Sequence, residues 1–157
     1  MNKKTYFERQ KNRYKEGEFR WCTQTVLQQH KENCRQIMRI ADEAVRLEFL
    51  FDLPWDMERT YKIEKFQYPI DWTYMPTDDS EFIYQMNRHR YFICLGQAYA
   101  MTGNEKYAEA FVRILRDWIE HVPLNQESKK VTWREIEAGS GERTGRKVFY
   151  ISRTVLW

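Results

Sequence analysis

The stretch Met86-Asn-Arg-His-Arg-Tyr-Phe-Ile-Cys-Leu-Gly-Gln-Ala-Tyr-Ala-Met-Thr-Gly-Asn-Glu-Lys-Tyr-Ala108 decides the fold. Its Thr102-Gly103-Asn104 segment supplies a glycine that suits a helix C-terminus and then a residue type that begins helices. The pattern predicts one helix over residues 80–102, with Ser80 as its N-cap, and a second helix over about 105–121. Because the turn between them is so short, the two helices must pack antiparallel.

The remainder of the chain predicts further helices. Residues 1–48 contain no proline and carry an apolar stripe near period 3.6, so we expect a helix there, broken near Gly17. Thr132 with Glu135 forms a capping box for a last helix that runs to Gly139. The Gly- and Arg-rich segment 140–157 differs in character. We therefore expect an all-α domain of antiparallel helical hairpins over residues 1–139, followed by an atypical tail.

Residues 49–79 have no sustained helical or alternating pattern. Three prolines punctuate a segment that is dense in aromatic residues. One interpretation is an aromatic strap that packs over the helices. The other is that some of these rings wall a binding cleft, because a long irregular segment within a compact domain is often functional.

Composition bounds the function classes. With 42% hydrophobic and 31% charged residues among 157, the chain belongs to the soluble globular class, and its net charge of +3 favours anionic partners only slightly. We expect no nucleic-acid binding, no membrane span, no metal site and no cofactor, and three reduced cysteines. The N-terminus lacks a signal-peptide pattern, which predicts a cytoplasmic protein as written, or a periplasmic or secreted one if a signal has been removed.

Two groups of residues are candidates for binding an anionic ligand. Asn87, Arg88, His89 and Arg90 offer donors to a carboxylate or sulfate, and arginine suits such groups because its planar fork bonds both oxygens. The competing interpretation places His89 at the edge of the core. The second group consists of Trp133, Arg134 and Glu137, either as an Arg134–Glu137 ion pair or as a cleft-lining arginine supported by a glutamate.

Residues 41–139 resemble the N-terminal region of the heparinase II/III family of polysaccharide lyases. The residues that carry the resemblance are Phe51-Asp-Leu-Pro-Trp-Asp-Met57, Ile70-Asp-Trp72, Asn87-Arg-His89, Leu95-Gly-Gln-Ala-Tyr99, Thr102-Gly-Asn-Glu-Lys-Tyr-Ala108, Asp117-Trp-Ile119 and Trp133-Arg-Glu-Ile-Glu-Ala-Gly139. The resemblance implies a partial α/α toroid, which the family completes with a β-sandwich. It also implies an acidic polysaccharide as partner, of the heparin, heparan sulfate or alginate type.

The family's reaction is β-elimination, in which a base removes the proton next to a uronate carboxylate and an acid protonates the leaving oxygen. The resemblance assigns these roles to an Asn-His pair on a later helix, a tyrosine and a distal histidine. None of these is recognisable here, and Asn87 with His89 belongs to an earlier hairpin motif. We therefore name no catalytic residue, and we expect the chain to bind substrate without cleaving it. The segment 140–157 departs from the family pattern and suggests a truncated or frame-shifted end.

Two function classes remain open. One is the N-terminal portion of a polysaccharide lyase, and the other is a non-catalytic helical domain for carbohydrate binding or protein interaction. In either case Arg88, His89 and Arg134 are expected to converge on one face. We also expect either self-association through an uncovered helical face or a poorly ordered segment 140–157, because a large apolar surface is rarely left bare.

Overall fold

The computed structural model describes residues 24–53, 56, 60 and 62–134 of the chain. Within these ranges the elements are α3 (Lys31–Val45), β1 (Glu48–Phe49), β2 (Glu64–Lys65), α4 (Glu81–Asn87), α5 (Tyr91–Thr102), α6 (Lys106–His121) and the 3₁₀ turn η1 (Ser128–Lys130). Residues 24–29 are also helical. The predicted all-α class is confirmed, and the small two-stranded sheet is an addition that the sequence did not predict.

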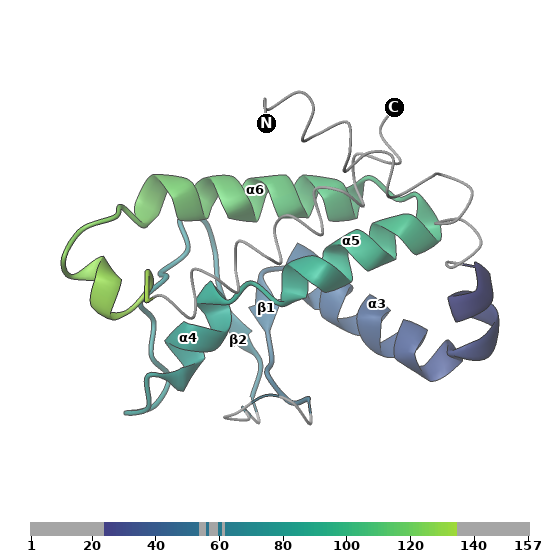
Figure 1. Ribbon diagram of the computed structural model, residues 1–157, viewed down its shortest axis with the longest axis horizontal. Coiled ribbons are helices and arrows are strands. Elements are labelled where there is room, and N and C mark those ends of the chain that lie inside the picture. The colour runs from purple at the N-terminus through teal and green to yellow at the C-terminus, as the bar shows by residue number, and fades with distance from the viewer. Residues whose placement is uncertain (1–23, 54–55, 57–59, 61, 135–157) are drawn as a thin grey trace, which may run out of the picture.

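The predicted αα-hairpin is confirmed at its turn. Gly103 adopts a left-handed φ of 66°, and its N–H bonds to the Tyr99 carbonyl at 2.7 Å, which ends α5. One residue later the Asn104 side-chain oxygen accepts a hydrogen bond of 3.1 Å from the N–H of Lys106 and begins α6. Figure 1 shows α5 and α6 running side by side across the top of the molecule.

The hairpin packs against α3 to form the core. On α6 the buried residues Tyr107, Ala110, Phe111 and Ile114 recur at helical spacing, so one stripe of the helix faces inward. α5 contacts both α3 and α6, and Leu95 and Ala98 on α5 are fully buried. Polar groups reinforce the same contact: Asp42 on α3 accepts hydrogen bonds from Lys106 Nζ at 2.8 Å and from the Tyr107 hydroxyl at 3.0 Å.

Within the described residues, the N-terminal helical region has a break at His30 that the sequence did not predict. Helical residues 24–29 end at His30, whose φ of −123° and ψ of 49° are not helical, and α3 begins at Lys31. Gly17, where the break was predicted, lies outside the described residues. After α3, Leu47 takes a positive φ of 56°, which turns the chain into β1.

Several rings of the aromatic segment 49–79 pack against the helices, as the strap interpretation expects, whereas Tyr74 is 37% exposed. Phe49, Phe51 and Trp72 are buried, and β1 pairs antiparallel with β2 in the register Glu48↔Lys65 and Phe49↔Glu64. Figure 1 places this sheet beside α4 and below the hairpin. The two strands are only two residues long, too short for the alternation that reveals a strand in a sequence.

The predicted helix over residues 80–102 is wrong in one respect, because the structure divides it into α4 and α5. The start after Ser80 is correct, but the Ser80 side chain makes no capping bond. Instead the Asp79 carboxylate accepts the N–H of Glu81 at 2.8 Å. The predicted helix at 132–139 falls mostly outside the described residues. Thr132 lies in a turn after η1, where its hydroxyl donates to the Ser128 carbonyl at 3.4 Å.

Candidate functional site

The break between α4 and α5 is centred on His89, which has a left-handed φ of 53°. Such a backbone is uncommon for a residue other than glycine, although histidine is one of the types that tolerate it. The chain resumes its helical bonding directly afterwards, since the N–H of Phe92 donates to the His89 carbonyl at 2.9 Å. The four residues from Asn87 to Arg90 are therefore directed to different surroundings and do not form one face.

His89 points into the core. Its ring stacks on Phe92 with centroids 4.9 Å apart and meets the edge of Trp118 at 5.2 Å, and only 4% of the residue is exposed. Burial lowers the pKa of its imidazole to about 3, so the ring is neutral near pH 7. Among the described residues, His89 Nε2 has no hydrogen-bond partner. The predicted convergence of His89 with Arg88 and Arg134 is therefore wrong, because the left-handed backbone turns the imidazole inward.

Asn87 is also buried, and its amide holds three segments together. Its Nδ2 donates to the Ile83 carbonyl at 2.8 Å and to the Trp72 carbonyl at 3.3 Å. Its Oδ1 accepts a hydrogen bond of 2.9 Å from Trp118 Nε1. These bonds give Asn87 a structural task at the end of α4. A substrate contact by Asn87 stays a prediction.

Asp117 forms a second buried junction, which the sequence did not single out as a site. Its Oδ2 accepts hydrogen bonds from Trp72 Nε1 at 2.8 Å and from the Ile70 N–H at 3.1 Å. The two sequence motifs Ile70-Asp-Trp72 and Asp117-Trp-Ile119 thus meet in space. Together with Asn87, this junction fixes the aromatic segment and α4 against α6.

Arg88 and Arg134 both contact α4, and they do so on one side of it. Arg88 Nη1 forms an ion pair of 2.5 Å with Glu81 Oε1, and the guanidinium of Arg134 lies 4.0 Å from the centre of the Tyr84 ring. Glu81, Tyr84 and Arg88 are three and then four residues apart, so they share a helix face. The structure therefore brings together two of the three residues that were expected to converge.

Trp133 fastens the segment that carries Arg134. Its Nε1 donates to the Val122 carbonyl at 3.0 Å, and its ring lies 4.6 Å from that of Trp118. Trp133 is thus packed onto the end of α6, next to the Asn87 junction. Glu137, the remaining member of the predicted group, lies outside the described residues, so the Arg134–Glu137 pair stays a prediction.

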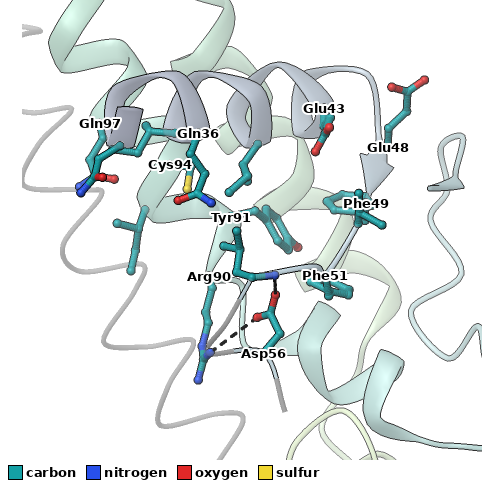
Figure 2. Close-up of a pocket in the computed structure, with 16 residues that line it drawn as sticks. Gln36, Glu43, Glu48, Phe49, Phe51, Asp56, Arg90, Tyr91, Cys94 and Gln97 are labelled. Carbon is teal, nitrogen blue, oxygen red and sulfur yellow. Dashed lines mark hydrogen bonds and ion pairs between the residues drawn. The ribbon is translucent and has the colours of Figure 1, made fainter. Parts of the chain in front are cut away.

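Arg90 lies elsewhere, at a cavity of about 500 Å³ between α3, α5 and the chain that follows β1. Figure 2 shows Arg90 directed toward Asp56, with Arg90 Nη1 3.9 Å from Asp56 Oδ1. The sequence did not reveal this cavity, because three separate segments supply its walls. Within the described residues, no group of three or more histidine, cysteine or acidic side chains is placed to hold a metal ion.

The α5–α6 hairpin packed against α3 fits the α/α toroid class that the resemblance implied. The chain belongs to the heparinase II/III N-terminus family, whose family model matches residues 3–152. This match extends further in both directions than residues 41–139, where the resemblance was first recognised.

Similar proteins agree with this family. The chain is 35% identical over 92 residues to a heparin-sulfate lyase from Bacteroides stercoris, a match that covers 59% of this chain and 13% of that protein. It is 33% identical over 73 residues to a heparin-sulfate lyase from Bacteroides thetaiotaomicron, covering 45% of this chain and 10% of the relative. The chain thus spans a small part of the length of these relatives.

A solved structure supports the fold. The crystal structure of a heparan sulfate lyase from Pedobacter heparinus superimposes with a TM-score of 0.64 and 26% identity, covering 77% of this chain and 18% of that one. The predicted partial α/α toroid is confirmed. In the part of the chain that the structure describes, no helix is long and apolar enough to cross a bilayer.

Proposed function

We propose that this chain is the substrate-contacting N-terminal part of a lyase that acts on uronate-containing polysaccharides of the heparin or heparan sulfate type. The observation that carries the proposal is the family match over residues 3–152, together with relatives that are named heparin-sulfate lyases. The same match leaves alginate open as a substrate, and the experiment below distinguishes the two classes.

The α4 face is the surface that we assign to substrate contact. Arg134 lies over the Tyr84 ring, and Arg88, which is 7% exposed and paired with Glu81, is on the same side of α4. A guanidinium recognises planar carboxylate and sulfate groups by paired hydrogen bonds. Tyr84, whose ring lies 4.0 Å from the Arg134 guanidinium carbon, is half-buried. An acidic sugar that binds here shares Arg88 with Glu81, so we expect modest affinity and a strong dependence on salt.

We further propose that these 157 residues bind without cleaving. β-Elimination requires a base with a pKa near neutrality that faces the substrate. The chain has three histidines. His89 is enclosed in the core, and burial lowers its pKa to about 3. His30 is exposed at the start of α3, and His121, exposed at the end of α6, has its Nδ1 2.8 Å from the Asp117 carbonyl oxygen.

Binding is tested by titrating the full chain with heparin, heparan sulfate, hyaluronan and alginate oligosaccharides at low salt. We expect heparan sulfate to bind to the wild-type chain. The Arg88→Ala, Arg134→Ala double variant should bind it at least about tenfold more weakly, which corresponds to about 1.4 kcal/mol of binding free energy. Arg116→Ala is the matched control, because Arg116 is an exposed arginine on α6. Equal binding by the double variant and the wild type would contradict the proposal.

Cleavage is tested on the same mixtures by the absorbance of unsaturated uronate products. We expect none from the purified chain. Steady product formation would overturn the non-catalytic assignment and leave the binding assignment intact. Failure of all four polysaccharides to bind would favour the second function class, a helical domain that interacts with other partners.

Self-association and the boundary at residue 139 stay predictions. Val112 and Ile119 are exposed on α6, with 48% and 62% of each residue accessible, so this helix offers an apolar contact to a second copy. Sedimentation of the wild type and of an Ile119→Lys variant tests this. A monomer at all concentrations would contradict self-association.

A further inference from the structure

The cavity beside Arg90 has the size of a small-molecule site. It holds about 500 Å³ and lies between α3, α5 and the segment after β1 (Figure 2). Binding sites for small ligands are usually clefts of ~300–1,000 Å³ that are lined mostly by apolar and aromatic groups with a few polar ones. The cavity meets both conditions, in volume and in lining. Arg88 and Arg134 of the α4 face do not line it, so the cavity is separate from the surface assigned to the polysaccharide.

The body of the cavity is apolar. Phe49, Phe51 and Tyr91 contribute aromatic rings from two separate segments, and all three are buried. Ile37 and Ile40 on α3 and Ile93 on α5 line the same space. Filling such a cavity with a ring or a branched chain recovers contacts that its walls otherwise lack.

The charged part of the lining is mainly acidic. Glu43, Glu48 and Asp56 face the cavity, against a single cation, Arg90. Glu48 is bound by Arg46 and Lys65, and Asp56 accepts the Leu53 N–H and pairs with Arg90. Glu43 is 7% exposed and pairs with Arg39 at 3.2 Å.

Both carboxylate oxygens of Glu43 accept hydrogen bonds from Arg39 Nη1, at 3.2 and 3.3 Å. The burial of Glu43 raises its pKa in spite of the neighbouring Arg39. A positive charge brought to the cavity would therefore be stabilised at Glu43. A uronate or a sulfate would meet carboxylates of its own sign on an apolar floor, which is unfavourable.

We propose that this cavity is a binding site for a small amphipathic cation, an aromatic or branched aliphatic body that carries a protonated amine. The body would occupy the space between Phe49, Tyr91 and Ile93, and the amine would face Glu43. The site is independent of the polysaccharide surface proposed above, since the two differ in location and in the sign of their charge.

The first test uses the wild-type chain with isotope-labelled isoleucine methyl groups. Phenethylamine is the probe, and 2-phenylethanol and 3-phenylpropionate are its neutral and anionic counterparts. We expect phenethylamine to shift the methyl signals of Ile37, Ile40 and Ile93 while those of Ile114, which is fully buried, and Ile119, which is exposed, stay in place. We expect the amine to bind at least about tenfold more tightly than the anion.

Two variants locate the site. Cys94→Phe fills the cavity, because Cys94 lines it, and should abolish the shifts with all three probes. Glu43→Gln should reduce the preference for the amine over the alcohol several-fold while the alcohol binds as before. Glu109→Gln is the matched control, an exposed glutamate on α6 outside the lining.

Three results would overturn the proposal. The first is an absence of shifts at saturating amine, which would show that the cavity does not take this ligand. The second is binding of the anion as tightly as the amine. The third is a shift of the same three methyl signals by heparin, which would assign the cavity to the polysaccharide and leave the proposed function standing.

Discussion

The indole Nε1 of Trp118 donates a hydrogen bond of 2.9 Å to the side-chain oxygen of Asn87. This bond joins the C-terminal half of α6 to the end of α4, two elements that the chain separates by the whole of α5. Arg88, the last residue of the α4 face, follows Asn87 directly. The orientation of that face therefore depends on a buried amide rather than on surface charges.

Replacement of Asn87 by alanine should lower the free energy of unfolding by about 3 kcal/mol. The substitution leaves Trp118 Nε1 without its acceptor and the Trp72 carbonyl without its donor, and each buried unpaired group costs roughly 1–3 kcal/mol. Urea denaturation measures the change. Gln67→Ala, at an exposed position, is the control and should change stability by under about 0.5 kcal/mol.

Trp72 and Asp117 should show energetic coupling in a double-mutant cycle. Trp72→Phe removes the donor of the 2.8 Å bond to Asp117 Oδ2, and Asp117→Asn weakens the acceptor. We expect a coupling free energy of about 1–2 kcal/mol, because hydrogen bonds to charged groups are the stronger kind. The pair Trp133→Phe and Asp117→Asn should be additive, since Trp133 Nε1 bonds to Val122 instead. Coupling of equal size in both cycles would argue against a specific bond.

His89 should make the fold less stable in mild acid. The pKa of His89 is about 3 in the folded chain, below its ordinary value of 6.5, so only the unfolded chain takes up this proton between those values. Its contribution to stability is thus fully present above pH 6.5 and is lost as the pH falls toward 3, by about 2 kcal/mol at pH 5. The difference in unfolding free energy between pH 7 and pH 5 should be correspondingly smaller in His89→Asn, which keeps a residue that tolerates the left-handed backbone. Equal pH dependence in both chains would contradict this account.

Gly103→Ala should lower the free energy of unfolding by about 1 kcal/mol, because alanine is strained in this backbone conformation. The position has a φ of 66°, and a Cβ placed there would meet no atom within 4 Å, so no steric clash contributes. Gly103→Asn should cost less than alanine, because asparagine adopts this conformation more readily. Thermal or urea unfolding of the two variants shows which is the more stable. A larger loss of stability with asparagine than with alanine would show that φ is not what determines the effect.

The α5–α6 hairpin could be predicted from the sequence because interactions between neighbouring residues determine it. A glycine at a helix end and an asparagine at the next helix start satisfy orphan backbone groups within a few residues of each other, whatever the rest of the fold does. The same holds for the inward stripe of α6, where apolar side chains recur at helical spacing between Tyr107 and Ile114. The family resemblance rested on short motifs of this kind, and it predicted the fold class and the family correctly.

Tertiary structure decided where the side chains of those motifs point. A run of helix-compatible residues predicts a continuous helix through His89. The neighbouring sequence gives no sign that the His89 backbone is left-handed. This backbone lets the imidazole pack among Phe92, Trp118 and Trp72. That choice is favoured by contacts with residues far along the chain. It separates Arg88 from Arg90, placing one on the α4 face and the other at the cavity.

The cavity itself is a property of packing alone. Its walls come from α3, from the chain after β1 and from α5. The residue spacing within any one of these segments does not predict that Glu43 and Arg90 line the same space. Sequence by itself determined which residues could form helices, turns and charged faces, because those preferences act over a few bonds. Only the folded chain decided which of them meet, because burial and hydrogen bonding between distant segments set the final positions.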